Sequence, residues 1–320
     1  MSKKKATKKS KKSKKKEEDA KEETKGKKYA FYIGCLTPAR ETAYETSFRR
    51  VFKELGVELV EMKGVNCCGL PIDPIDHDMA MSLATRNLTI GEDMGLDIIT
   101  LCSGCAGTLT KAHKHLKEDR EERERINNYL KEIGREFKGT VEAKHMIKVL
   151  VEDIGLERIK KHIKNPLKGV KIAEHYGCHV LRPAEVLQFD NEDNPTILRR
   201  LIELTGAEPV RYEGEDDCCG SVIIGVDKDI SFNLVKNKLV HVMEAGADAM
   251  VTICPSCHFQ FDQNQPMIEK MFAEEYGIPV LHYPQLLGLA MGIPPEELAL
   301  DDLKVDADMV VAKAIAVGEV

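Results

Sequence analysis

The stretches LDIITLCSGC, residues 96–105, and ADAMVTICPSC, residues 247–257, each carry an apolar run directly into a CxxC motif. In both cases a CCG triplet lies upstream, at 67–69 and 218–220, and 33 or 34 residues separate its second cysteine from the CxxC motif. A Gly–Cys pair stands further upstream still, at 34–35 and 177–178. The chain therefore contains one five-cysteine pattern twice, and the two copies use all ten of its cysteines.

The sequence around these cysteines predicts an α/β architecture in each half, because short β-rich runs alternate with helical periodicity. Such alternation favours a small parallel sheet in each half. Functional loops normally lie at the carboxyl ends of parallel strands, which is where the Gly–Cys, CCG and CxxC segments fall. The expected strands are 29–34, 57–62, 97–101, 170–176, 208–212 and 249–253, and the expected helices are 40–55, 77–94, 106–131, 195–205, 227–245 and 258–273.

The repeat also predicts how the chain is divided. We expect a first cysteine-rich domain at 29–155 and a second at 170–292, joined by a linker at 156–169. A lysine-rich tail at 1–28 precedes them, and a mostly helical tail at 293–320 follows. Inside the first domain, the charge-rich residues 118–139 are expected to form a solvated helix and a connector.

The lysine-rich tail separates charge along the chain. Residues 1–28 contain 14 lysines and five acidic residues, a charge of +9, so the remainder carries −15 of the total of −6. The tail has almost no apolar residues and is expected to be disordered. It has no interleaved aromatic residues, so we expect no nucleic-acid binding. The chain has no run of 18 apolar residues and no apolar stretch behind its first lysines, so we expect a cytoplasmic protein with no membrane span and no secretory signal.

Clustered cysteines in such a chain favour metal binding over structural disulfides. A zinc site takes four ligands, often from two CxxC pairs, whereas each half offers five cysteines and a single CxxC. A thioredoxin-type redox motif, which residues 254–257 resemble locally, leaves the other cysteines unexplained. Iron–sulfur ligation fits best, because soft thiolates suit iron–sulfide clusters. The candidate ligands are Cys35, Cys67, Cys68, Cys102, Cys105, Cys178, Cys218, Cys219, Cys254 and Cys257.

These segments carry a resemblance to a known family. GCLTPARETAYETSFRRVFKELGVELVEMKGVNCCGLPID at 34–73, with LCSGC, HYGCHVLRPAEV, DDCCG and ICPSCHFQFD, resembles the B subunit of the heterodisulfide reductases of methanogens. The resemblance covers roughly residues 29–292. The doubled CCG pattern is shared with a wider superfamily, which includes iron–sulfur proteins of glycolate and lactate oxidation and the thiol-driven fumarate reductase.

The resemblance implies cofactors, a substrate and partners. It implies one noncubane [4Fe-4S] cluster on each five-cysteine set, with the two clusters facing each other across the mixed disulfide of coenzyme M and coenzyme B. Electrons would arrive from the iron–sulfur C subunit, and ultimately from the flavin of the A subunit, to give the two thiols in the last step of methanogenesis. The alternatives are an electron-relay subunit of a glycolate/lactate-type oxidoreductase or thiol-driven fumarate reductase, and a metal-binding scaffold without catalysis. Because the chain lacks a ferredoxin-like CxxCxxC motif, we expect it to receive electrons from a partner.

Four other side chains are weaker candidates for the site. Arg40 and Arg182 follow the first cysteine of their halves by five and four residues and are candidates for binding an anionic substrate, with salt bridges as the alternative. His179 and His258 each follow a cysteine directly and are candidates for proton transfer to a leaving thiolate. For both histidines, packing or a hydrogen bond to cluster sulfur is the alternative.

Two further pairs are expected to be structural. His145 and His282 recur at matching positions of the halves, each ten residues before a glycine, which indicates a role near a strand end. Asp73 and Asp76 follow the first CCG triplet and are expected to cap the next helix.

Overall fold

Two four-stranded parallel sheets, one in each half, form the framework of the protein. The structure is a computed structural model, and it describes residues 27–316 of the 320. The strand orders are β2-β1-β3-β4 and β6-β5-β7-β8, so the halves share one topology, and the predicted α/β repeat is confirmed. The strands are β1 (Lys28–Tyr32), β2 (Glu58–Glu61), β3 (Ile98–Thr100), β4 (Ala143–His145), β5 (Lys171–His175), β6 (Glu208–Val210), β7 (Ala249–Thr252) and β8 (Val280–His282).

The fourth strand of each sheet was not among the expected strands. Both β4 and β8 have three residues, which is too short for an alternating pattern to appear, and each ends on a histidine. They pair in parallel with β3 and β7, so each closes one edge of its sheet. His145 and His282 therefore lie at strand ends, where the following helix begins, as the repeat indicated.

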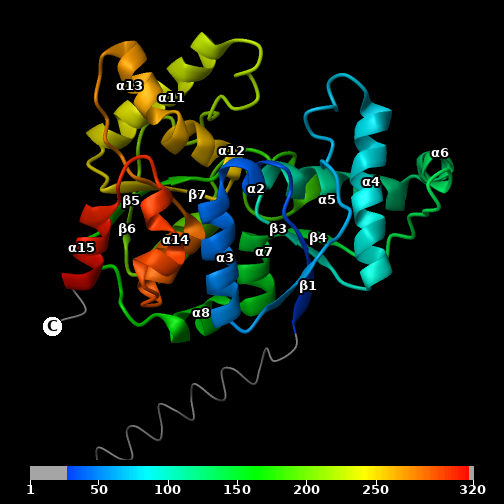
Figure 1. Cartoon of the computed structure of the whole chain (residues 1–320), viewed down its shortest axis with the longest axis horizontal. Coiled ribbons are helices and arrows are strands. Elements are labelled where there is room, and N and C mark those ends of the chain that lie inside the picture. Colours follow the sequence, from blue (N-terminus) through cyan, green and yellow to red (C-terminus); the bar gives the residue numbers. More distant parts are fainter. Residues whose placement is uncertain (1–26, 317–320) are drawn as a thin grey trace, which may run out of the picture.

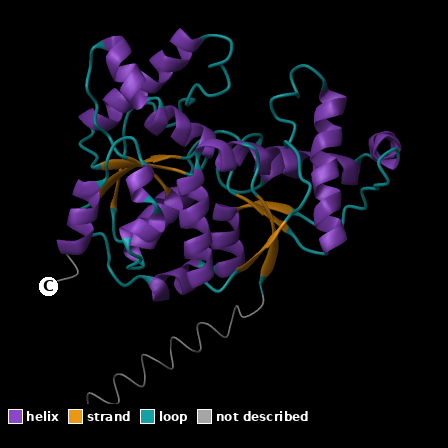
Figure 2. Cartoon of the chain, in the orientation of Figure 1, coloured by secondary structure: helices purple, strands orange, loops and turns teal. Residues whose placement is uncertain are grey.

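Helices cover the sheets and fill the space between them (Figures 1 and 2). In the first half they are α2 (Leu36–Arg40), α3 (Thr42–Glu54), α4 (His77–Met94), α5 (Ser103–Glu118), α6 (Arg120–Lys131), α7 (Met146–Lys148), η1 (Val149–Ile154) and α8 (Leu156–His162). In the second half and beyond they are α9 (Ala184–Leu187), α10 (Ile197–Leu204), α11 (Lys228–Glu244), α12 (Pro255–His258), η2 (Phe259–Gln263), α13 (Gln265–Phe272), α14 (Tyr283–Ala290), η3 (Pro295–Leu298), η4 (Leu300–Asp302) and α15 (Asp308–Ala316).

Three of the expected helices are interrupted. The helix expected at 106–131 is two helices, because Asp119 leaves helical geometry and its side chain caps α6 through the backbone N–H of Glu122. The helix expected at 258–273 begins earlier, at Pro255, and continues as η2 and α13. The helix expected at 40–55 breaks at Glu41, which has a non-helical backbone between α2 and α3.

Helix caps recur at equivalent places in the two halves. The Asp76 carboxylate accepts the Met79 N–H at 2.9 Å at the start of α4, and Asp227 accepts the Ile230 N–H at 2.9 Å at the start of α11. The expected cap at Asp76 is thus present, whereas Asp73 pairs with His77 instead.

A shared hydrophobic core joins the halves. Helix α3 buries Tyr44, Phe48, Val51 and Phe52 on one face, with the i, i+4, i+7, i+8 spacing of an amphipathic helix. This face packs against α14 between the two sheets (Figure 1), and Ile172 of β5 belongs to the same core. Buried residues from 156–169 and from 293–316 also join this core, so both segments pack against the domains.

The lysine-rich tail lies, apart from its last two residues, outside the described residues. Lys28 already belongs to β1, one residue before the expected strand, and its ammonium pairs with Glu58 at 2.8 Å. Within residues 27–316, none of the helices combines the length and apolar character needed to cross a bilayer.

The glycine of each CCG triplet is required by close packing as well as by backbone geometry. Gly69 has a φ of +96°, and a Cβ there would lie 2.5 Å from the backbone oxygen of Ala80 in α4. Gly220 repeats the arrangement with a φ of +75° and a distance of 2.9 Å to the Ser231 oxygen of α11. The turn therefore holds the adjacent cysteines against the start of the next helix.

We expect Gly69→Ala to destabilise the fold by about 3 kcal/mol, because the new Cβ adds overpacking to a strained left-handed backbone. Gly64→Ala is the matched control, since Gly64 has a φ of +73° but no atom within 4 Å of the position that a Cβ would take. That control is expected to cost only about 1 kcal/mol. Chemical denaturation of both variants measures the difference, and equal costs would contradict the packing argument.

Candidate metal centre

The five cysteines of the first half converge at the carboxyl end of its sheet. Cys35 follows β1, Cys67 and Cys68 follow β2, and Cys102 follows β3 and leads into α5, which contains Cys105. A Cβ at Gly34, next to Cys35, would lie 3.2 Å from the Cys105 sulfur, which shows how closely these loops meet. The parallel topology thus gathers cysteines that are up to 70 positions apart in the sequence.

The second half repeats this arrangement. The Sγ atoms of Cys257 and Cys219 lie 3.4 Å apart, and the Gly220 N–H donates to the Cys218 sulfur at 3.3 Å. A Cβ at Gly177, next to Cys178, would lie 3.6 Å from the Cys257 sulfur. The shared geometry confirms that the sequence repeat is also a repeat of the site.

The two five-cysteine sets meet at their CxxC motifs. Cys102 and Cys254 meet across the boundary between the halves, since Cys102 packs against the hydrophobic cluster of the second half that contains Cys254. Around this contact, the Tyr44 hydroxyl lies 3.0 Å from the carbonyl oxygens of both Leu101 and Ile253. These carbonyls belong to the residues just before the two CxxC motifs. A pair of cluster sites would therefore lie side by side.

His145 reinforces the same junction. Its Nε2 atom lies 3.0 Å from the carbonyl oxygen of Leu101 and 3.0 Å from that of Ile253. The Ser103 hydroxyl also reaches Ile253, at 3.5 Å. Tyr44 and the Cys102–Cys254 contact were not found from the sequence, because they depend on packing between halves that are far apart along the chain.

The thiol pKa values show that sulfur atoms crowd together in both sets. A hydrogen bond from Cys105 lowers the pKa of Cys68 to about 6, against the effect of burial. The pKa of Cys105 is raised by the hydrogen bonds that it makes to Cys102 and Cys68, and by burial. Neighbouring thiols share protons because adjacent buried thiolates repel one another. A bound cationic centre would remove this conflict and allow the thiolates to coexist.

The donor set fits iron–sulfur clusters. All ten cysteines are free thiols, and five soft donors in each half converge on one place. Gly34 leaves room where a Cβ would press on the Cys105 sulfur, and a Cβ at Gly177 would be in van der Waals contact with the Cys257 sulfur. Nothing in this geometry selects four of the five cysteines for a tetrahedral zinc site.

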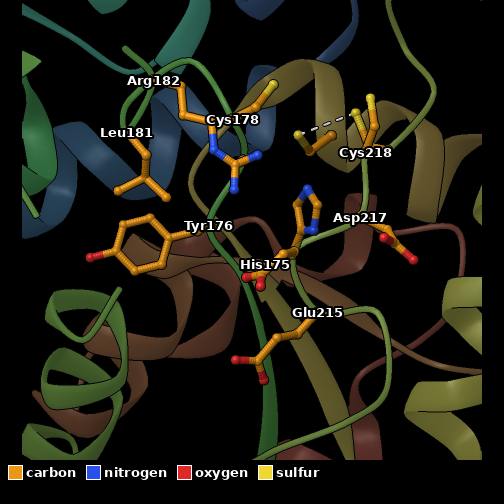
Figure 3. Close-up of a pocket in the computed structure, with 12 residues that line it drawn as sticks. His175, Tyr176, Cys178, Leu181, Arg182, Glu215, Asp217 and Cys218 are labelled. Carbon is orange, nitrogen blue, oxygen red and sulfur yellow. Dashed lines mark hydrogen bonds between the residues drawn. The ribbon is translucent and has the colours of Figure 1, made fainter. Parts of the chain in front are cut away.

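A pocket opens beside the second set (Figure 3). Cys178 and Cys218 face it, together with Arg182 and the acidic Glu215 and Asp217. Cys218 is exposed, as is Cys35 in the first set, so one thiol of each set is open to solvent. An incoming molecule can reach the two sets from these sides.

The two arginine candidates lie in different surroundings. Arg182 is exposed at this pocket, where its guanidinium donates to the Glu192 carbonyl at 3.2 Å. Arg40 is exposed at the end of α2. Substrate contact by either residue stays a prediction, and the position of Arg182 beside Cys178 is the more favourable one.

His179 lies at the boundary between the halves. A Cβ at Gly107 of α5 would lie 2.5 Å from the His179 carbonyl oxygen, so the two backbones touch. Burial lowers the pKa of His179, with Cys254 opposing and Lys111 adding to the effect. Its half-buried ring is thus neutral near pH 7 and lies in the field of both a thiol and an ammonium group. Proton transfer by His179 stays a prediction.

His258 is placed in a buried cluster with Glu41 and His282. Its Nδ1 lies 2.6 Å from the Glu41 carboxylate, and its Nε2 lies 2.8 Å from the Val280 carbonyl oxygen. The His282 Nε2 reaches the same Glu41 oxygen at 3.1 Å. Both nitrogens of His258 are therefore engaged within the protein, and this favours a structural role over proton transfer to a thiolate.

The charges of this cluster follow from its pKa values. Burial alone would raise the pKa of Glu41, but hydrogen bonds from His258 and His282 lower it to about 2. Burial opposes protonation of His258, yet Glu41 raises its pKa overall. Burial and the charge of His258 lower the pKa of His282 to about 3. The cluster is thus an ion pair between Glu41 and His258, beside a neutral His282.

Comparison with known proteins agrees with this geometry. Residues 29–110 and 172–262 each match the cysteine-rich domain family, CCG. The chain is 39% identical over 279 residues to the B subunit of the ferredoxin/F420H2-dependent CoB–CoM heterodisulfide reductase of Methanosarcina acetivorans, covering 86% of this chain and 92% of that protein. It is 33% identical over 285 residues to the 8-methylmenaquinol:fumarate reductase membrane anchor subunit of Wolinella succinogenes, covering 88% of this chain and 98% of that protein.

A solved structure shares the fold. A hypothetical protein from Helicobacter pylori matches with a TM-score of 0.70 and 13% sequence identity, over 88% of this chain and 52% of that one. The two sheets share one topology, and each gathers five cysteines at its carboxyl end. These features define the class of proteins with two cysteine-rich domains. Within that class, the chain belongs to the family of heterodisulfide reductase B subunits.

Proposed function

We propose that this chain is the catalytic iron–sulfur subunit of a heterodisulfide reductase complex. It binds two [4Fe-4S] clusters of noncubane type, one on each five-cysteine set, and reduces the mixed disulfide of coenzyme M and coenzyme B to two thiols. The observation that carries the proposal is the meeting of the two complete sets at their CxxC motifs, where Tyr44 and His145 both contact the carbonyl oxygens of Leu101 and Ile253. Disulfide cleavage needs two electrons, and two adjacent one-electron centres match that requirement.

The reaction that the site must support is balanced by two electrons and two protons, which convert one disulfide bond into two S–H groups. When bound, the clusters supply the electrons and a soft metal that accepts sulfur. The chain supplies the thiolates that hold them, and its exposed Cys35 and Cys218 mark the open sides of the two sets. His179 is the histidine best placed to relay a proton at the boundary, because, unlike His258, it is not engaged by Glu41 or by a backbone carbonyl among the described hydrogen bonds. Its neutral ring would take up a proton from water and pass it to the leaving thiolate.

The cleft between the halves contains lysine side chains that could bind the anionic groups of the substrate. Lys111 and Lys114 of α5 line it together with His115, opposite Glu185 of α9. Lys111 lies close enough to His179 to affect its pKa. Sulfonate, carboxylate and phosphate groups bind ammonium groups well. We propose Lys111 as a substrate contact, in addition to Arg182.

Electron delivery requires a partner subunit, and exposed apolar side chains near the CCG triplets offer a docking surface for it. Ile75 and Val226 are 85% and 88% exposed, and Met79 and Ile230 are 53% and 51% exposed. These pairs occupy equivalent positions after the two CCG triplets, beside the cysteines. We propose that the iron–sulfur C subunit, which receives electrons from the flavin-bearing A subunit, docks over the residues Ile75 and Met79 or over their counterparts.

We expect the double variant Ile75→Asp and Met79→Asp to weaken binding to the C subunit by at least about tenfold, because it places charge in the apolar contact. The pair Val226→Asp and Ile230→Asp tests the other patch. Met309→Asp is the matched control, since Met309 is 68% exposed on α15, away from the CCG loops. Surface plasmon resonance with the purified C subunit measures the affinities. Unchanged affinity in both double variants would contradict this docking site.

The activity is tested with the purified chain under anaerobic conditions. A reduced viologen dye supplies electrons, and free thiols are counted after addition of the coenzyme M–coenzyme B disulfide. The proposal requires two thiols for every two dye electrons. Dye oxidation without thiol release, or none at all in a cluster-loaded protein, would favour the relay role suggested by the fumarate reductase relative.

A further inference from the structure

The two halves differ at a position beside the cysteines that the sequence repeat aligns. Tyr32 and His175 are each the third residue before the first cysteine of their half, and they end the equivalent strands β1 and β5. The Tyr32 hydroxyl donates to the Asn66 carbonyl oxygen at 2.6 Å, just before the CCG triplet. Its donor is therefore used by the backbone and is not available to a sulfur atom.

His175 has no such backbone partner. The side chain is 3% exposed, and neither ring nitrogen has a hydrogen-bond partner of good geometry among the described residues. A nitrogen of His175 and the sulfur atoms of Cys219 and Cys257 all lie within 4.8 Å of one another. Figure 3 shows the His175 ring pointing from β5 into the pocket, on the side of the sulfur atoms. A buried imidazole without a partner is costly, so the sulfur ligands are its natural acceptors.

The halves also differ at a second aligned position, which carries a cation in the second half and a neutral side chain in the first. Lys238 of α11 and Asn87 of α4 both stand 18 residues after the glycine of their CCG triplet. Asn87 is a neutral side chain that bonds to the backbone carbonyls of Asn66 and Cys67. Lys238 is 2% exposed, and its ammonium group donates to backbone carbonyls at 2.7 and 3.0 Å. The second half thus places a buried cation where the first half has an amide.

Before its CCG triplet, the second half also carries the acidic residues Glu215, Asp216 and Asp217. Their negative charges oppose the effect of the Lys238 cation on the nearby sulfur atoms. Glu215 is paired with Arg199 and Arg211. Asp216 and Asp217 are exposed, so water and salt screen their charges. His175 lies within 4.8 Å of the sulfur atoms of Cys219 and Cys257, so its effect acts at closer range and in a medium of lower dielectric constant. Burial lowers the pKa of Lys238, whereas Asp217, Cys257 and Cys219 are close enough to raise it against that effect.

We propose that His175 donates its ring N–H to the Cys219 thiolate and, together with Lys238, makes the cluster of the second half the one with the higher reduction potential. This rests on the proposed binding of two clusters. A hydrogen bond or a nearby cation stabilises the added negative charge of a reduced cluster. Electrons entering through the first half would then settle in the second. His175 and Lys238 are positioning residues, because they act through the cysteine ligands.

The test is a potentiometric titration of the cluster-loaded protein, followed by electron paramagnetic resonance. His175→Tyr copies the first half, and Lys238→Asn does the same at the second position. Tyr32→Phe is the control in the first half. Cys105→Ser, which leaves only the second five-cysteine set complete, identifies the signal of the second cluster. The proposal predicts that both second-half variants lower the midpoint potential of that signal, while Tyr32→Phe leaves it unchanged.

The iron content of each protein distinguishes a failure of this inference from a failure of the proposed cluster binding. Unshifted potentials in His175→Tyr and Lys238→Asn proteins that keep about eight irons would overturn this inference and leave the cluster proposal intact. Wild-type protein without iron would overturn the cluster proposal itself. Labelling the histidines with nitrogen-15 gives an independent readout. A weak coupling at the second cluster that disappears in His175→Tyr supports the hydrogen bond, and a strong coupling typical of direct iron ligation would overturn it.

Discussion

Replacing Cys219 with serine is expected to abolish disulfide reduction, by at least about a hundredfold, and to halve the iron content from about eight to about four atoms per chain. Cys219 is buried at the centre of the second set, 3.4 Å from the Cys257 sulfur. A serine oxygen is a harder donor that stays protonated, so it does not replace a thiolate as an iron ligand. In the proposed reaction each half delivers one electron, so one cluster alone would not be sufficient.

Two controls separate loss of the cluster from general damage. Ser256→Ala changes the CxxC loop of the same half without replacing a cysteine, and it should retain iron and activity. Cys105→Ser should lose the iron of the first half instead, and its disulfide reduction should fall as far as in Cys219→Ser. Iron and sulfide analysis with dye-linked thiol release measures all three variants. Full activity in Cys219→Ser with only half of the iron would contradict the requirement for two clusters.

Replacing Glu41 with alanine is expected to destabilise the protein by about 3–5 kcal/mol, because it leaves a buried protonated histidine without its partner. Glu41 is 2% exposed, and its carboxylate lies 2.6 Å from His258 and 3.1 Å from His282. The contact joins the first half to two elements of the second. Glu58→Ala is the control, since Glu58 pairs with Lys28 at the surface and should cost less than about 1 kcal/mol.

The stabilisation by Glu41 is expected to depend on pH in both directions. Its folded pKa of about 2 lies below the ordinary value of 4.5, so its contribution is present above 4.5 and is lost as the pH falls through 2. The pKa of His258 is raised above 6.5, so its contribution is present below 6.5 and is lost as the pH rises through the raised value. The free-energy difference between wild type and Glu41→Ala should therefore fall above pH 6.5. Denaturant titrations at several pH values measure it, and a constant difference would contradict the ion pair.

The sequence predicted the two sheets and the place of the cysteines at strand ends, because both leave local signals. Apolar runs ending in Gly–Cys or CxxC place the cysteines at strand ends, and the parallel topology brings those ends together. The three-residue strands β4 and β8 leave no such signal. The break at Glu41 was also missed, because its backbone is set by contact with His258 of the other half.

The contact between the halves depends on pairs of residues that are distant in the sequence. Tyr44 meets Ile253, and Cys102 meets Cys254, across more than a hundred positions, and no periodicity marks such pairs. His175 differs in this respect, because the repeat itself aligns it with Tyr32. A residue-by-residue comparison of the two halves would have singled it out before the structure was known.

The central claim is that two thiolate-bound clusters take up the sulfur of the substrate. Anaerobic iron and sulfide analysis, with electron paramagnetic resonance before and after adding coenzyme M thiol under oxidising conditions, tests it most directly. The account predicts about eight irons per chain and a new paramagnetic signal when the thiol binds. Iron without any response to the thiol would contradict a catalytic role, and zinc in place of iron would contradict the clusters altogether.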